Sequence, residues 1–226
     1  MKVTYYGHAC FSVEVGNKNL LFDPFITGNE FAKNVDVKKI AADYILISHG
    51  HSDHTGDAVE IAKRTGATLV SNFEVTVWAG KQGVAKTHPL NHGGGHTFDF
   101  GRVKFVNAIH SSSLPDGSYG GNPGGFIVES PAGDFYYAGD TALTMDMKLI
   151  SESHNLLFAA LPVGDNFTMG VDDAIKAAQF IGCDEILGLH YNTFPPIRID
   201  EKQAVEKFLA AGKQLRLLHP GETHDF

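Results

Sequence analysis

The chain has 226 residues, of which 43% are hydrophobic, so it is long enough to bury a sizeable core. Acidic residues outnumber basic ones by 26 to 18, a formal charge of −8, and a surface of this kind is not expected to bind nucleic acid. The longest run free of polar residues, 156–163, has eight residues, whereas a membrane-spanning helix needs about 20. We therefore expect no membrane association.

The N-terminal residues also bear on location. Residues 1–15 alternate as strands do and lack the apolar core of a secretory signal, so a cytoplasmic location is expected. The only cysteines are Cys10 and Cys183, too few for a disulfide framework and typical of reduced thiols. We interpret both as core residues, with metal binding by Cys10, near His8, as the alternative.

The first part of the chain predicts strands and one helix. Short strands are predicted at 3–6, 11–15 and 19–22, separated by Gly7 and by residues 16–17. Residues 44–47 form an apolar run without alternation, as expected for a strand covered on both faces. The pattern "DAVEIAKRTG" predicts a helix that ends at Gly66, and a strand follows at 67–71.

The rest of the chain repeats this order of strands before helices. Strands are predicted at 96–100, 103–110, 125–130 and 134–139, with a tight turn before the last. Strands at 155–161, 185–190 and 215–219 then alternate with helices at 171–182 and 200–212. Two halves of this kind predict one domain over residues 1–226, with two sheets flanked by helices.

A cluster of metal-ligating residue types follows the strand at 44–47. The segment "ISHGHSDHTG" contains His49, His51, Asp53 and His54. Burial of so many polar groups without partners would be costly, and imidazole and carboxylate groups suit zinc and neighbouring divalent ions. Because alternate side chains on a flexible loop can face two points, two adjacent metal sites would use all four. An ordinary exposed histidine-rich loop is the alternative.

Three further polar residues each follow an apolar strand. His110, Asp140 and His190 come directly after the runs at 103–109, 134–139 and 185–189. In layered α/β proteins, functional sites form at the edge where strands end, so we expect these side chains to join the early cluster. His219 also follows a predicted strand and competes with His190 for the last position.

The run His-x-His-x-Asp-His at 49–54, followed by the three strand-end residues, resembles the metallo-β-lactamase superfamily over almost the whole chain. The resemblance implies an α/β (α+β) fold, a four-layer αβ/βα sandwich of two mixed sheets, with a dinuclear site at the sheet edge. It implies two divalent ions, with Zn favoured and Mn, Fe or Ni as alternatives. The implied ligands are His49, His51 and His110 for the first ion and Asp53, His54 and His190 for the second, with Asp140 bridging.

Several longer segments are similar to small uncharacterised metal-dependent hydrolases of that superfamily. They are "GHACFSVEV", "LLFDP", "HGGGHTFDFG", "FYYAGDTAL", "LPVGDNFTMG" and "LHYNTFP". They also resemble, more loosely, L-ascorbate-6-phosphate lactonases and N-acylphosphatidylethanolamine phospholipase D. The resemblance implies a hydrolase whose two metals activate hydroxide for attack on a small ester, lactone or phosphodiester. A non-catalytic or regulatory metal-binding protein of the same fold is the alternative.

Other residues receive predictions with two readings. Asp53 is expected to accept or orient the proton of the attacking water, in addition to binding metal. His8 is interpreted as a proton donor or electrostatic contact at the substrate mouth, or else as a turn histidine. Asp23 is either an acceptor for the N–H of a ligand histidine or a turn aspartate before Pro24.

Two glycine-rich segments complete the predictions. Residues 88–96, "HPLNHGGGH", contain His88, His92 and His96, which form either an independent metal site or a closely packed loop. Residues 111–125 are expected to form a wall or lid beside the site. The expected partner is a small-molecule substrate, and a homo-oligomer is left open.

Overall fold

Two seven-stranded sheets form the framework of the computed structural model, which describes residues 1–226. The first sheet has the order β14 (Thr223–Asp225), β1 (Lys2–Gly7), β2 (Cys10–Val15), β3 (Lys18–Phe22), β4 (Tyr44–Leu46), β5 (Thr68–Asn72) and β6 (Thr87–Leu90). The second has the order β13 (Gln214–Arg216), β12 (Glu185–Leu189), β11 (Leu156–Pro162), β10 (Asp134–Tyr137), β9 (Gly124–Glu129), β8 (Gly101–Asn107) and β7 (Gly95–Phe98). Both sheets mix parallel and antiparallel pairs, as predicted.

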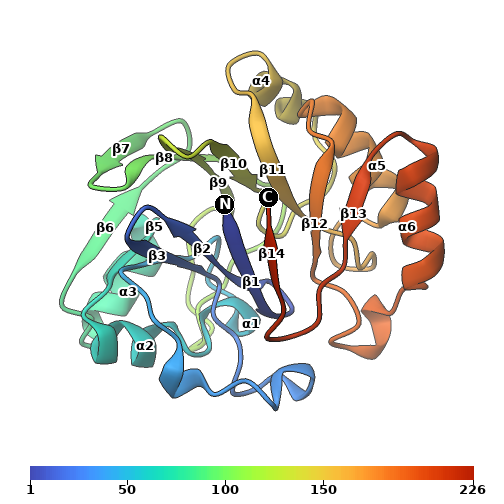
Figure 1. The fold of residues 1–226 in the computed structure, drawn as a ribbon. Coiled ribbons are helices and arrows are strands. Elements are labelled where there is room, and N and C mark those ends of the chain that lie inside the picture. The colour runs from blue at the N-terminus through green and yellow to red at the C-terminus, as the bar shows by residue number, and fades with distance from the viewer.

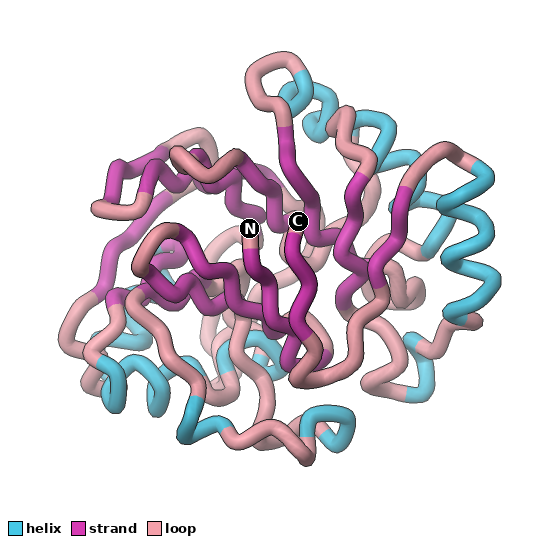
Figure 2. Tube along the Cα trace, viewed as in Figure 1, coloured by secondary structure: helices cyan, strands magenta, loops and turns pink.

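Helices cover the outer faces of both sheets (Figures 1 and 2). The α-helices are α1 (Ser52–Thr55), α2 (Ala58–Thr65), α3 (Phe73–Lys81), α4 (Lys148–Ser151), α5 (Val171–Phe180) and α6 (Glu201–Ala210). Short 3-10 helices are η1 (Glu30–Ala32), η2 (Val37–Lys39), η3 (Met145–Met147) and η4 (Pro195–Ile197). No helix is both long enough and apolar enough to cross a bilayer.

Three hydrophobic clusters define the four layers. The central cluster joins the inner faces of the sheets and includes Phe11 and Phe22 from the first sheet and Phe126 and Phe135 from the second. A second cluster packs α4, α5 and α6 against the outer face of β10–β12, and a third packs α2 and α3 against β4 and β5. This arrangement confirms the predicted αβ/βα sandwich.

Local signals explain several element boundaries. Helix α2 ends at Gly66, whose left-handed φ of 72° lets its N–H donate to Ala62 O, as predicted from the sequence. Helix α3 begins after Asn72, whose side chain accepts a hydrogen bond from the Val75 N–H. Alternation within β10 places Phe135 in the central cluster and Tyr136 on the outer face.

The structure contains elements that the sequence patterns did not predict. Helix α3 is rich in β-branched and aromatic residues, which have weak helix propensity, so its composition does not indicate a helix. Strand β6 contains Pro89, and this proline is tolerated because β6 lies at the edge of the sheet. The segment 52–55 was expected to be a loop, but it forms the helical turn α1 directly after His51.

Candidate metal centre

Polar side chains from both sheets gather at one edge of the sandwich. They follow β1 (His8), β3 (Asp23), β4 (residues 49–54), β8 (His110), β10 (Asp140) and β12 (His190). The cluster is withdrawn from solvent, since His49 and His54 are fully buried and Asp140 is 3% exposed. All seven predicted metal-ligating residues therefore lie in one region, with His8 beside them.

Three histidines form the first group of this cluster. The nearest ring nitrogens of His49, His51 and His110 all lie within 4.8 Å of one another. His49 Nε2 and His51 Nδ1 are 3.0 Å apart. Three imidazoles converging at this distance can hold one divalent ion.

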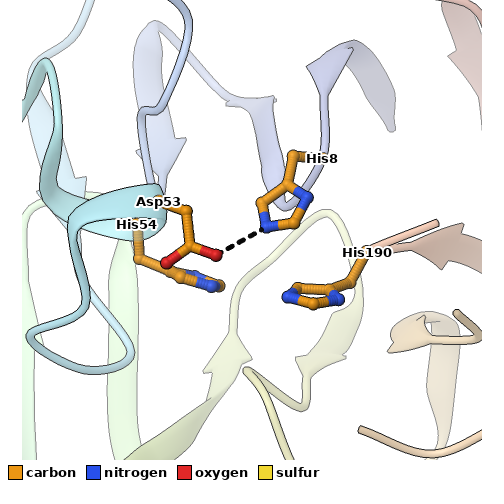
Figure 3. Close-up of side chains that lie close together, drawn as sticks. All are labelled: His8, Asp53, His54 and His190. Carbon is orange, nitrogen blue, oxygen red and sulfur yellow. Dashed lines mark hydrogen bonds and ion pairs between the residues drawn. The ribbon is translucent and has the colours of Figure 1, made fainter. Parts of the chain in front are cut away.

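The second group contains an aspartate and three histidines (Figure 3). The ligand atoms of Asp53, His54 and His190, together with one nitrogen of His8, lie within 4.8 Å of one another. His8 Nε2 is 3.2 Å from Asp53 Oδ2, and Thr193 Oγ1 is 3.0 Å from the other nitrogen of the same ring. Sequence position gave no indication that His8 and Asp53 would touch.

Asp140 lies between the two groups. Its Oδ2 is 3.3 Å from His54 Nε2, 3.0 Å from His190 Nε2 and 3.6 Å from His110 Nε2. One carboxylate oxygen thus faces histidines of both groups, which is the position that a bridging ligand needs.

Asp23 is the hub of a buried hydrogen-bond network behind the cluster. It accepts from the Ser48 N–H at 2.7 Å, the Ser48 hydroxyl at 2.5 Å, His54 Nδ1 at 2.7 Å and the Tyr137 hydroxyl at 2.5 Å. Of the two interpretations given for Asp23, the structure supports an acceptor for the N–H of a histidine in the cluster, His54. Ser48 Oγ in turn lies 2.9 Å from His49 Nδ1, so this network directs the Nε2 atoms of His49 and His54 into the cluster.

Three residues of this region have strained backbones. His8, Asp23 and His190 adopt left-handed φ angles of 57°, 38° and 55°. Such conformations cost about 1–3 kcal/mol each in non-glycine residues and occur mainly at functional sites. The His190 N–H donates to His8 O at 2.9 Å, which fastens the two strained turns, one from each sheet, to each other.

Close backbone approach supports the turn at His190. A Cβ atom at Gly164 would lie 2.0 Å from His190 O, so only glycine fits beside it.

Burial keeps several histidines of the cluster neutral. Burial lowers the pKa of His51 and His110, and it lowers the pKa of His49 well below its usual value. Burial likewise lowers the pKa of His8 to about 4. Neutral imidazoles are the form that binds metal, so these rings need not lose a proton at neutral pH.

His54 and Asp140 form a charged pair. Burial opposes charge on both, yet Asp140 and Asp23 together raise the pKa of His54 well above its usual value. Despite burial, His54 and His190 hold the pKa of Asp140 well below its usual range. Burial opposes ionisation of Asp53 too, but its hydrogen bond with His8 and the nearby His54 lower its pKa.

The cluster has the chemistry of a divalent-cation site. His54 Nε2 is buried and has no hydrogen-bond partner, and the two carboxylates of Asp53 and Asp140 are held ionised among imidazoles. Imidazole nitrogens and carboxylate oxygens are the donors that zinc and its neighbours prefer. The residues present therefore fit divalent metal ions.

Two residues that support the cluster, Asp57 and Ser112, are not predicted as site residues from the sequence. Asp57, read as the start of a helix, is buried and accepts from the N–H groups of Ile26 at 2.6 Å and Thr27 at 2.9 Å, which fixes the loop after Asp23. Ser112 Oγ accepts from the Gly50 N–H at 3.0 Å. This contact places the segment 111–125 against the histidine motif, as expected for a wall of the site.

Other candidate residues lie outside the cluster. The rings of His88 and His96 are 4.1 Å apart between centroids, but His92 donates to Pro123 O at 2.8 Å, and these three form no metal-capable group. Cys10 is buried in the hydrophobic cluster under α2 and α3, as expected of a core residue. His219 likewise belongs to no metal-capable group, whereas His190 lies in the second group.

Comparisons with known proteins agree with this geometry. A profile of the Beta-lactamase superfamily domain matches residues 2–190. Metal-dependent hydrolases of the UPF0173 family from Flavobacterium johnsoniae and Methylacidiphilum infernorum are 55% and 52% identical over 223 residues, each covering 99% of both chains. The structure of a metallo hydrolase from the archaeon Ignicoccus hospitalis superposes with a TM-score of 0.89 at 35% identity, covering 100% of this chain and 98% of that one.

A more distant structure shares the fold alone. An isothiocyanate hydrolase from Delia radicum gut bacteria has a TM-score of 0.81 at 20% identity.

Two mixed sheets between helical layers, with a histidine and aspartate cluster at their common edge, define the metallo-β-lactamase class of proteins. Metal-dependent hydrolysis is the activity for which its relatives are named. The chain belongs to the metallo-β-lactamase superfamily and, within it, to the UPF0173 family of metal-dependent hydrolases.

Proposed function

We propose that the cluster holds two divalent ions and that the protein hydrolyses a small ester, lactone or phosphodiester. His49, His51 and His110 hold one ion, Asp53, His54 and His190 hold the other, and Asp140 binds both. The observation that carries this proposal is the position of Asp140 Oδ2, 3.0–3.6 Å from histidines of both groups. Zinc is the favoured ion, and manganese, iron and nickel are the alternatives.

When bound, paired divalent ions supply Lewis acidity and lower the pKa of water toward neutrality. The protein contributes proton handling and orientation. Asp53 is ionised, so it can accept or orient the proton of an attacking water. His8 is neutral and donates its Nε2–H to Asp53, which fixes the direction of that carboxylate. We therefore assign His8 the positioning of Asp53 in preference to proton donation to the leaving group.

A non-catalytic metal-binding protein is the rival, and a substrate panel distinguishes the two. Protein purified without chelators or a histidine tag is first analysed for metal. Representative lactones, esters and phosphodiesters, including a sugar-acid lactone prompted by the looser resemblance, are then assayed with added Zn²⁺ or Mn²⁺. We expect turnover of at least one class and its loss on chelation. Stoichiometric metal without turnover across the panel would favour the rival.

Activity is expected to decline below about pH 6, because protons then compete with metal for the imidazoles. Burial lowers the pKa of His49, His51 and His110, so these rings gain protons only below the usual histidine range. Despite burial, Asp140 and Asp23 raise the pKa of His54 well above its usual value, so protons compete with metal first at His54. Metal content and rate measured together from pH 8 to pH 5 check this, with excess metal as the control that should restore part of the loss. A flat profile down to pH 5 contradicts the assignment of His54 as a ligand.

A further inference from the structure

A cavity lies on the outer face of the second sheet, away from the metal centre. It has a volume of about 350 Å³ and lies between strands β8–β10 and the η3–α4 segment. Apolar side chains, including Ile127, Met147 and Ile150, form much of its wall. None of the seven proposed metal ligands lines it, and its volume falls within the range of small-molecule sites.

Tyr136 lies in the wall of this cavity with an unsatisfied hydroxyl. The residue is fully buried, and its hydroxyl has no hydrogen-bond partner. Tyr136 pairs in register with Ile127 of β9, and both residues are among those that line the cavity. Burial raises the pKa of this hydroxyl, so it keeps its proton and can donate a hydrogen bond to a ligand. A buried donor without an acceptor is destabilising, which makes this group conspicuous in a well-packed layer.

Lys104 places a positive charge beside the same wall. The register pairs Lys104 with Ile127 and Ile127 with Tyr136, so the three form one row across β8, β9 and β10. Neighbouring strands lie about 4.8 Å apart, which puts Lys104 and Tyr136 on either side of Ile127. Lys104 forms no ion pair, unlike six other lysines of the chain.

The other ionisable groups at the cavity already have partners. Asp146 accepts from the Asn107 amide at 2.8 Å, and His154 Nδ1 lies 3.4 Å from Asp134. His92 donates to a backbone carbonyl. Lys104 and Tyr136 are therefore the free donors of the site, and both suit an anion with two acceptor oxygens.

We infer that this cavity binds a small monocarboxylic acid with a compact aromatic or branched apolar body. The carboxylate lies over Ile127, where it accepts a hydrogen bond from Tyr136 and pairs with the Lys104 ammonium. The apolar body packs against Met147 and Ile150. This site does not depend on hydrolysis at the metal centre.

A methionine methyl group reports on the cavity. In protein with its metal bound and ¹³C-methyl methionine incorporated, Met147 lines the cavity, whereas Met1 packs against the central cluster between the sheets and serves as the remote control. Titration with phenylacetate is expected to shift the Met147 signal to saturation and leave Met1 in place. Phenylacetamide, which lacks the charge, is expected to bind at least ten-fold more weakly. Absence of a saturable Met147 shift, or equal binding of phenylacetamide, would overturn the proposal.

Two variants test the named contacts. Tyr136→Phe and Lys104→Gln are each expected to weaken phenylacetate binding at least ten-fold, while metal content stays unchanged. Lys148→Gln is the matched control, since the Lys148 ammonium lies 4.7 Å from the Phe180 ring and outside the cavity. Because Tyr136→Phe removes an unpartnered hydroxyl, the unliganded Tm should be equal or higher. Unchanged affinity in both variants, or loss of folding in Tyr136→Phe, would refute the inference.

Discussion

Asp140→Ala is expected to lower the turnover rate by on the order of 10³-fold or more. Loss of metal interactions worth several kcal/mol in the transition state corresponds to a factor of this size. The physical reason is that Asp140 Oδ2 alone faces histidines of both groups, at 3.3 Å from His54 Nε2 and 3.6 Å from His110 Nε2. Removal of this carboxylate takes away the negative charge that lies between the two groups, next to His54, His110 and His190. We expect one metal equivalent or more to be lost per chain.

The measurements are the metal-to-protein ratio and the rate on whichever substrate the parent enzyme hydrolyses. Asp134→Asn is the matched control, because Asp134 lies on β10, the strand that Asp140 follows, and also faces a histidine, His154 at 3.4 Å, outside the cluster. The control should retain metal and rate. Full turnover by the Asp140→Ala protein with both metals bound would remove the basis for a bridging role.

Asp23→Ala is expected to have the largest effect on stability. The substitution removes the acceptor for the Ser48 N–H and hydroxyl, His54 and Tyr137, all in fully buried surroundings. Removing one partner from a buried charged network costs about 3–5 kcal/mol, because the remaining groups stay buried and unpaired. Loss of the acceptor that directs a ligand histidine should also weaken metal binding about 10–100-fold.

Urea denaturation of the protein without metal gives the free energy of unfolding. Metal titration of the folded variant gives its metal affinity. Asp43→Ala provides a comparison, because Asp43, like Asp23, lies next to the end of a strand. Asp43 is half-buried and accepts mainly from the Asn19 N–H at 2.8 Å. Its loss should cost about 1 kcal/mol. If Asp23→Ala were no more destabilising than Asp43→Ala, the network behind the cluster would contribute little.

Much of the fold was readable from local patterns. Apolar runs such as residues 44–47, and the glycine-terminated helix that ends at Gly66, gave the correct element types because burial and capping act on neighbouring residues. Helix α3 escaped prediction because its apolar residues are spread around the helix, and β14 because three residues carry no period. The candidate ligands were also indicated by the sequence, because four of them cluster at 49–54 and the other three each follow an apolar run.

The contacts within the site were not readable in the same way. That Asp23 supports His54, that His8 touches Asp53, and that the Tyr136 hydroxyl has no partner all depend on residues distant in sequence. Periodicity and strand ends follow from interactions within a few residues, so the linear order of side chains records them. Hydrogen bonds between segments depend instead on how two sheets pack and where each turn bends. The order of side chains along the sequence does not specify that packing directly. Only the tertiary structure shows which of these residues touch.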